Sequence, residues 1–330
     1  MKKRIVKLLQ RVYFHSRAAV GGYEEMRGPL GSKFDHCDPS NKFGQKTWEM
    51  AEGEMTRMAL NIALDKGNLS HEEVDFVVGG DLQNQCVATS IGLSSFSIPF
   101  LGVYGACSTC TESLLIASAL LQSPHLRVGA AITSSHNSAA ERQFRSPIEY
   151  GGQRTGSAQW TATAAGSFIL TKEKSSAAIT EFMVGKMVSG ETMDGSNMGG
   201  AMAFAAADTI LSYYKEAGDD FDLIITGDLG KVGSAVLRDI LREENPALAD
   251  KHTDCGLLIY DDKIQDAHSG ASGCGTSASV FAAHFLPMIQ RGEIKNAILL
   301  STGALMNPSS ILQKNPIYGI APLLKIQHIC

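Results

Sequence analysis

The sequence predicts a duplicated α/β fold in five layers, in which two central helices are buried between two sheets. The first observation is a repeat, because residues 74–82 (VDFVVGGDL) return as residues 221–229 (FDLIITGDL), 147 positions later (221 minus 74). The second observation is that three further pairs of matching windows follow in the same order along the chain. These pairs are 105–109 with 272–276, 127–133 with 295–301, and 166–170 with 321–324.

The repeat divides the chain into an N-terminal half, residues 1–175, which carries Cys107, and a C-terminal half, residues 176–330. The repeated strand is a run of β-branched and large apolar residues that ends in Gly-Asp-Leu, the pattern of a strand covered on both faces. The carboxyl ends of two such strands deliver polar groups to a crevice. We therefore expect a single site between the two halves.

Helical patterns occupy matching places in both halves. The helix predicted at 108–121 is apolar nearly all round, which favours a position between two layers. The helix predicted at 276–289 has the same character, and Pro287 is expected to kink or end it. Apolar spacing at 47–63 predicts a further helix, and 100–103 is expected to form a short buried strand.

Length, composition and charge fit a large folded core. The chain has 330 residues, of which 44% are hydrophobic and 19% are charged, and this composition excludes a disordered chain. The formal net charge is -5, and lysines and arginines form no stripe interleaved with aromatic residues. A nucleic-acid footprint is therefore missing, and we expect no nucleic-acid partner.

The first segment is unusually basic. Lys7 and Arg11 interrupt any apolar stretch before it reaches the length of a signal peptide, so we expect no cleaved leader. The alternatives are a solvated first segment and a contact with anionic lipid. No run approaches the ~20 apolar residues of a membrane-spanning helix. Any association with a membrane is therefore expected to be peripheral.

The seven cysteines lack the dense spacing of a disulfide scaffold, which favours a reducing compartment. Cys107 and Cys110 form an isolated Cys-x-x-Cys pair. A zinc site would require further ligands, and His125 and His136 lie too far along the chain to be an obvious pair. A redox dithiol is the other hypothesis, because the pair opens a helix where the backbone dipole favours a thiolate.

The strand, the Gly-Ala-Cys turn at 105–107 and the buried helix that follows resemble the thiolase and β-ketoacyl synthase superfamily over essentially the whole chain. This resemblance implies a thiolase-like αβαβα fold with Cys107 at the position of the acyl-accepting nucleophile. It also implies two helpers, a histidine and a histidine or asparagine, which fall on Gly227 and Gly275. Glycine has no side chain for either role, so we expect no condensing enzyme. We also expect no cofactor and no metal.

Eight longer strings carry a second, more specific resemblance. They are GDLQNQ at 80–85, GACST at 105–109, TSSHN at 133–137, AERQFR at 140–145, EYGGQ at 149–153, GAMA at 200–203, DCGL at 254–257 and SGC at 272–274. These strings are similar to the stage V sporulation protein AD (SpoVAD) family of spore-forming bacteria. The departures are the basic first twenty residues, Cys110, and the pair Gly275-Thr276.

The resemblance to this family implies a protein without catalytic activity that binds dipicolinic acid (pyridine-2,6-dicarboxylate). It implies a peripheral location at the spore inner membrane. Its partners would be the other SpoVA membrane proteins, and its role would be dipicolinate uptake during sporulation and release at germination. Members of the wider superfamily often pair through the sheet edge of the first half, so we expect a homodimer.

Dipicolinate is a flat dianion, and a helix N-terminus offers backbone N–H donors to it. Asp81 and Asp228, the two strand-end aspartates, favour helix caps or turns over contact with an anion. Two candidates could instead make contacts within the protein. His136 can form a hydrogen bond with a loop carbonyl, and Arg142 can pair with Glu141 or Glu149. The predicted ligand contacts are Cys107, Ser108, Asn84, Gln85, His136, Asn137 and Arg142.

A second function class stays open. Cys107 could accept an acyl group with an unrecognised base, such as His136 or His268. The glycines at 227 and 275 argue against this enzyme. A thiol-disulfide oxidoreductase that uses Cys107 and Cys110 is a third hypothesis.

Overall fold

The computed structural model describes residues 3–144, 154–190 and 192–330. Ten main strands run in two sets of five that share one order, β4-β3-β5-β7-β1 and β11-β10-β13-β16-β8. The first set is β1 (Ile5–Gly21), β3 (Phe76–Gly80), β4 (Phe100–Gly102), β5 (Val128–Ser135) and β7 (Ala164–Thr171). The second set is β8 (Ala177–Met183), β10 (Leu223–Thr226), β11 (His252–Asp254), β13 (Asn296–Leu300) and β16 (Leu323–His328).

The two sets are joined into one hydrogen-bonded sheet by β1. Its first part pairs antiparallel with β8, from Ile5 opposite Met183. Its last part pairs antiparallel with β7, up to Gly21 opposite Ala164. The basic opening of the chain is therefore an interior strand of the sheet, which neither of our hypotheses for this segment anticipated. The division of the chain at residue 175 stays a prediction.

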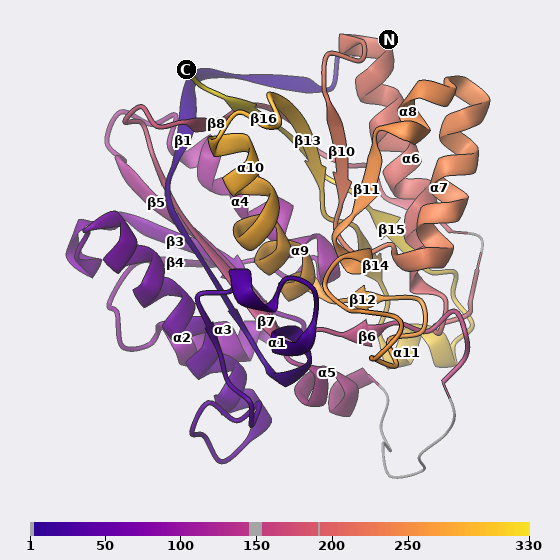
Figure 1. Cartoon of the computed structure of the whole chain (residues 1–330), viewed down its shortest axis with the longest axis horizontal. Coiled ribbons are helices and arrows are strands. Elements are labelled where there is room, and N and C mark those ends of the chain that lie inside the picture. The colour runs from indigo at the N-terminus through magenta and orange to yellow at the C-terminus, as the bar shows by residue number, and fades with distance from the viewer. Residues whose placement is uncertain (1–2, 145–153, 191) are drawn as a thin grey trace.

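Helices lie in three layers around these strands (Figure 1). One outer layer covers the first set of strands, and another covers the second set. The outer helices are α2 (Trp48–Gly67) and α3 (Val87–Leu93) on one side, and α6 (Met198–Ala217), α7 (Gly230–Glu244) and α8 (Pro246–Asp250) on the other. The central layer contains α4 (Thr109–Leu120), α9 (Cys274–Val280) and α10 (Leu286–Gln290).

Alternate residues of each strand pack into different layers, as expected for a sheet covered on both faces. Val78 of β3 and Ile225 of β10 belong to the central core with Leu114 of α4. The neighbouring Val77 packs in the outer core with α2, and Ile224 packs in the other outer core with α6 and α7. The predicted five-layer αβαβα arrangement with two buried central helices is confirmed.

Two local predictions need correction. The strand at 100–103 was expected to be buried, but β4 is exposed because it forms the edge of the sheet. The helix at 276–289 was expected to kink or end at Pro287, yet the helical path continues to Gln290. It does so through a π-helical turn, Phe281–Phe285, which precedes the proline. Proline lacks an N–H, and the wider turn accommodates that missing donor.

Shorter elements surround the ends of the central helices. They were not predicted from the sequence, because each is too short to show a period. They are α1 (Tyr23–Arg27), α5 (Asn137–Phe144), α11 (Pro308–Leu312), β2 (His36–Cys37), the pair β6 (Trp160–Thr161) and β12 (Ala271–Ser272), and the sheet of β9 (Val188–Ser189), β14 (Gly303–Leu305) and β15 (Tyr318–Ile320).

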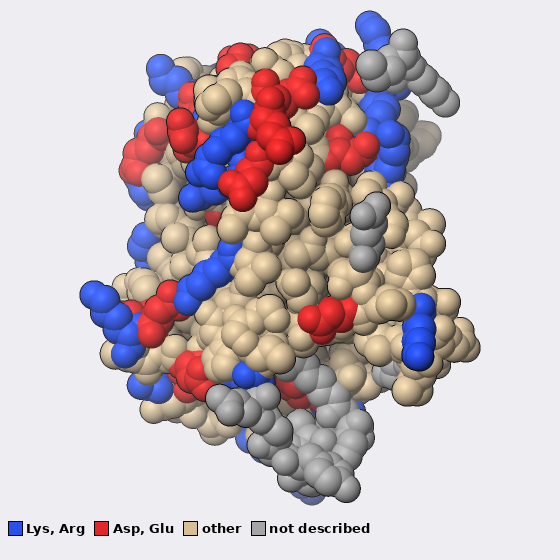
Figure 2. Space-filling view, turned by 90° about the vertical axis from the view of Figure 1, so that its right-hand side faces the viewer, with Lys and Arg blue, Asp and Glu red and all other residues tan. Residues whose placement is uncertain are grey.

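Basic and acidic side chains are interspersed on the face that Figure 2 shows, and a broad uncharged area lies between them. Within the described ranges, no helix combines the length and the apolar character that crossing a membrane requires.

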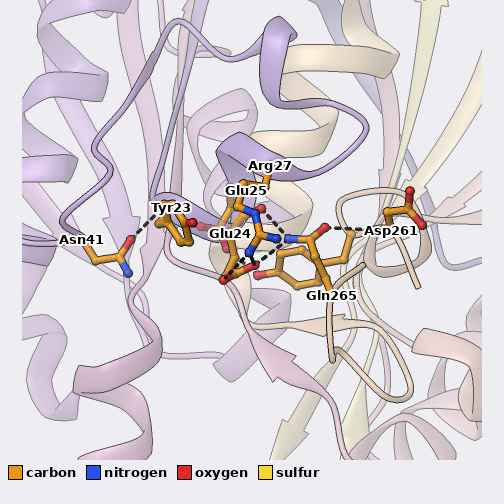
Figure 3. Close-up of polar contacts among 8 residues, drawn as sticks. Tyr23, Glu24, Glu25, Arg27, Asn41, Asp261 and Gln265 are labelled. Atoms are coloured by element: carbon orange, nitrogen blue, oxygen red, sulfur yellow. Dashed lines mark hydrogen bonds and ion pairs between the residues drawn. The ribbon is translucent and has the colours of Figure 1, made fainter. Parts of the chain in front are cut away.

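The segment after β1 reaches across to the second half of the chain (Figure 3). Gln265 Nε2 donates to the carbonyl oxygen of Glu24 at 2.7 Å and to its Oε2 at 2.8 Å. Beside it, Glu25 is 1% exposed and accepts hydrogen bonds from the Tyr260 hydroxyl and from the backbone N–H of Thr163. Burial outweighs these donors and raises the pKa of Glu25 to about 7.

We expect stability to fall as the pH rises from about 4.5 to about 7, because the unfolded chain releases the Glu25 proton first. Replacing Glu25 by Gln removes this contribution. Relative to wild type, the variant should therefore gain about 3 kcal/mol of unfolding free energy across that window, an order-of-magnitude value. Urea titrations of both proteins at several pH values measure the difference. Parallel stability curves would contradict the assignment.

Candidate functional site

A cavity of ≈ 630 Å³ lies where the two halves meet, beyond the carboxyl end of β3 and beside the start of α9. The first half contributes Leu82 and Cys107 to its wall, and the second half contributes Ser272, Gly273 and Ala304. Most of the described wall is apolar or aromatic. The volume is in the range of small-molecule sites, and the position matches the predicted crevice between repeated strand ends.

Cys107 is held in this wall by a sharp turn at the start of α4. The preceding residue, Ala106, has φ 54°, a left-handed conformation that non-glycine residues seldom adopt. The turn places Cys107 in a small buried cluster with Leu82, Ala140 and Cys274, the cysteine of the repeated window. The two cysteines that the repeat relates therefore lie in one cluster.

The thiol of Cys107 is held in its protonated form. Burial raises its pKa well above the ordinary value, and the neighbouring carboxylate of Asp228 raises it further. A position at a helix N-terminus favours a thiolate, but here burial and the carboxylate outweigh the helix dipole. The environment of Cys107 is therefore opposite to that of an activated nucleophilic cysteine.

Asp228 is fully buried beside Cys107 and bonds the start of α9. Its Oδ2 accepts the backbone N–H of Gly273 at 2.8 Å, and Thr302 Oγ1 donates to its Oδ1 at 3.4 Å. Burial raises the pKa of Asp228 to about 7, while hydrogen bonding to Cys107 lowers it. We expected both aspartates to cap helices or form turns. Asp81 accepts the backbone N–H of Gln83 at 2.8 Å in the turn after β3, and Asp228 accepts the N–H of Gly273, the residue before α9.

The two glycines at the expected helper positions lie in crowded surroundings. A Cβ atom at Gly275 would lie 2.1 Å from the carbonyl oxygen of Ala164 and 2.7 Å from Ser135 Oγ. A Cβ at Gly227 would lie 3.0 Å from Ser301 Cα. No side chain fits at Gly275 unless the backbone moves. Moreover, no histidine is among the described residues that line the cavity.

Two of the predicted ligand contacts lie in the turn after β3. The Tyr104 hydroxyl donates to Asn84 Oδ1 at 3.0 Å, and the Asn84 backbone N–H donates to Gln143 Oε1 at 3.0 Å. Gln85 is exposed and has φ 59°. Neither residue is in the described wall of the cavity.

Ser108 and His136 are buried but engaged elsewhere. Ser108 Oγ is hydrogen-bonded to the carbonyl oxygen of Gly105 at 2.6 Å. His136 Nε2 is hydrogen-bonded to the carbonyl oxygen of Asn41 at 2.8 Å, and its ring packs on Trp48 with centroids 5.3 Å apart. His136 therefore makes the hydrogen bond to a loop carbonyl that we considered as the alternative to ligand contact.

Asn137 and Arg142 also make contacts within the protein. Asn137 Nδ2 donates to the carbonyl oxygen of Thr161 at 3.2 Å. Arg142 pairs with Glu49, a carboxylate that was not among the partners considered. Of the seven predicted contacts, only Cys107 lines the cavity among the residues described. The roles of all seven in ligand binding stay predictions.

Two charged residues of the cavity wall, Glu141 and Arg154, were not among the predicted ligand contacts. Arg154 lines the cavity. It directly follows residues 149–153, one of the strings that carry the family resemblance. That string is outside the described residues. A basic residue in a polar segment with no periodicity carries no sequence signal for burial, so only the three-dimensional arrangement identifies it.

The Cys-x-x-Cys pair does not present two thiols to the cavity. Cys110 is 1% exposed, and burial raises its pKa to about 12, although the neighbouring hydroxyls of Ser277 and Ser301 act in the opposite direction. Its thiol is therefore protonated, which disfavours a redox dithiol. Residues 3–144, 154–190 and 192–330 contain no group of three or more His, Cys, Asp or Glu side chains placed to hold a metal ion.

We expect Asp228→Asn to lower the pKa of Cys107, because it removes the neighbouring negative charge. A decrease of one pH unit would raise the thiolate fraction, and hence the alkylation rate above neutral pH, by about tenfold. Mass spectrometry of iodoacetamide-treated protein measures this rate, with the exposed Cys330 as the internal reference. An unchanged Cys107 rate in a folded variant would show that the carboxylate does not control the thiol.

Comparisons with known proteins agree with this geometry. The family described as Stage V sporulation protein AD (SpoVAD) has a sequence model that matches residues 2–327. A relative from Bacillus subtilis (strain 168), named Stage V sporulation protein AD, is 42% identical over 313 residues. These cover 94% of this chain and 92% of that protein.

Solved structures of condensing enzymes share the fold at low identity. A variant of Xanthomonas campestris OleA has a TM-score of 0.62 and 11% identity, over 98% of this chain and 100% of that one. The 3-oxoacyl-[acyl-carrier-protein] synthase III of Aquifex aeolicus VF5 has a TM-score of 0.58 and 14% identity, over 95% and 99%. The predicted thiolase-like fold is confirmed, and at this identity the likeness extends to the fold alone.

Proposed function

Because this chain belongs to the stage V sporulation protein AD family, we propose that it binds dipicolinate in the cavity beside Cys107 and catalyses no reaction on it. Within the SpoVA assembly, this binding serves the movement of dipicolinate into spores and its release at germination. The family supports the sporulation context. The proposals for the ligand and for the SpoVA assembly come from the family resemblance found in the sequence.

The chemistry of the cavity suits a flat aromatic dianion. Tyr104 and Phe144 offer aromatic walls, and Leu82 offers an apolar surface to a pyridine ring. Cys107, protonated, is a weak hydrogen-bond donor where a thiolate would repel a carboxylate. The helix that begins after Cys107 adds a favourable dipole for an anion.

The main support for the absence of catalysis is the lack of space for a side chain at Gly275. Condensing chemistry needs groups that polarise a thioester carbonyl and transfer protons. A Cβ at Gly275 would lie 2.1 Å from a backbone oxygen, so no imidazole or amide can occupy the second helper position. The carboxylate of Asp228 lies beside the sulfur and raises the pKa of the thiol instead of activating it.

We propose a peripheral location at the spore inner membrane, where integral SpoVA proteins would supply the path across the bilayer. In this arrangement the chain acts as the ligand-binding component, and its partners move the ligand. The binding step can therefore be tested on the purified chain alone.

Calorimetric titration with dipicolinate should give saturable binding, whereas incubation with an acyl-CoA should leave the mass of the Cys107 peptide unchanged. Cys107→Ser should still bind dipicolinate, because the thiol lines the wall without forming a bond to the ligand. An acyl adduct on Cys107 that turns over, together with no heat from dipicolinate, would support an acyl-transferring enzyme and reject the proposal.

We further propose a homodimer formed through the edge strand β4. This strand ends the sheet, pairing only with β3 among the described strands, and exposes Phe100 and Leu101 by 38% and 48%. An unpaired apolar edge favours pairing with a second copy. Sedimentation velocity should show a wild-type dimer and a monomeric Leu101→Glu variant, with Leu9→Glu as the control on an exposed residue elsewhere. A wild-type monomer at all concentrations tested would reject this interface.

A further inference from the structure

We propose that Arg154 forms a carboxylate-binding site in the wall shared by the large cavity and a second, outer cavity. The outer cavity has a volume of ≈ 180 Å³. Its wall includes Arg27, Trp160, Tyr260 and Gln265. Arg154 lines both cavities. The identification of its carboxylate with dipicolinate rests on the proposed function, whereas the site itself rests on the arrangement of this arginine.

The guanidinium of Arg154 is fixed on two sides. Its Nη2 donates to the carbonyl oxygen of Asp266 at 2.6 Å and to Asp266 Oδ2 at 3.1 Å. Its Cζ lies 4.9 Å from the centroid of the Trp160 ring, a cation–π contact. Asp266 also bonds His268 Nε2 at 2.8 Å, which holds the carboxylate in place. The arginine is thus oriented before any ligand arrives.

One nitrogen of this oriented group has no partner. Nη1 of Arg154 is buried, and no hydrogen-bond acceptor of the described residues reaches it. A buried cationic N–H without an acceptor is costly, because it has lost water and gained nothing in return. Proteins pair such groups, and the Arg154 side chain keeps 21% of its surface exposed, where a carboxylate could approach the guanidinium.

Two charged residues, Arg154 and Glu141, are among the described residues that line the large cavity, and only Arg154 can attract an anion. It is the only lysine or arginine among the described residues that line that cavity. The surrounding wall includes Tyr104, Phe144 and Met306, which suit a flat apolar body. The site therefore fits a small planar carboxylate whose ring lies against the apolar wall and whose charge meets Arg154.

Arg27 provides a matched comparison. It also lines the outer cavity, but it is absent from the described wall of the large one. Its guanidinium already pairs with Glu24 at 3.4 Å and lies 5.2 Å from the centroid of the Tyr23 ring. Both arginines thus stack on an aromatic ring and contact an acid. They differ in access to the large cavity and in the unpartnered Nη1.

The experiment compares wild type, Arg154→Gln, Arg154→Lys and Arg27→Gln, all as full chains with folding checked by circular dichroism. Calorimetry uses pyridine-2,6-dicarboxylate and the uncharged pyridine-2,6-dimethanol. Fluorescence of Trp160 in a Trp48→Phe background reports binding of glutarate, because the chain has two tryptophans. We expect Arg154→Gln to weaken binding of both carboxylates at least tenfold, Arg154→Lys to weaken it less, and Arg27→Gln to stay within twofold of wild type.

The outcomes separate this inference from the proposed function. Dipicolinate binding that is unchanged in folded Arg154→Gln would overturn the inference and leave the proposed function intact. Glutarate binding that depends on Arg154, in a protein that ignores dipicolinate, would support the inference and reject the proposed ligand. If neither carboxylate binds, both fail. If Arg154→Gln does not fold, the comparison of Arg154→Lys with wild type decides, and equal affinities would overturn the inference.

Discussion

The hydrogen bonding of β1 to two partners is the constraint on which the rest of the molecule depends. Its first part pairs with β8 and its last part with β7, so the two repeated sets of strands have a fixed relation. That relation brings the starts of α4 and α9 together in the central layer. The cavity and the cluster of Cys107 and Cys274 both follow from it. The strand at the seam therefore positions the site without contributing a residue to the described cavity wall.

The site combines the geometry of a nucleophile with the electrostatics of a structural thiol. The left-handed turn at Ala106 presents Cys107 to the cavity. Burial and Asp228 keep its proton in place. The Asp228 carboxylate accepts the backbone N–H of Gly273 at the start of α9. It therefore connects the end of β10 to the start of the central helix. The same fold that elsewhere supports condensing enzymes can in this way hold a binding cavity instead.

The layered fold could be predicted from the sequence because its strands and central helices are long enough to show apolar patterns. Each repeated strand contains consecutive apolar residues, such as Val77-Val78 and Ile224-Ile225. A continuous apolar run predicts a strand that is packed against other elements on both faces of the sheet. β1 was missed because lysines and arginines interrupt its apolar residues. The exposure of β4 was missed because an edge position depends on the order of strands, which no local pattern reveals.

Prediction of the site was weaker, for a physical reason. Chain position placed the residues after β3 and β5 at the correct edge of the sheet. However, side chains there choose the nearest partners, so His136 bonds Asn41 and Arg142 pairs with Glu49. Arg154 bonds Asp266, which lies more than a hundred positions further along the chain. Asp228 bonds Gly273, which lies about forty-five positions further along. Such partners are set by the tertiary fold alone.

The continuous sheet also determines how the cavity can select its contents. Because β1 is hydrogen-bonded to both β7 and β8, backbone bonds as well as the chain itself join the two halves, which disfavours the hinge closure of separate domains. A cavity whose walls are formed in advance loses less conformational entropy when a ligand binds. Selection would then depend on the size and shape of the ligand.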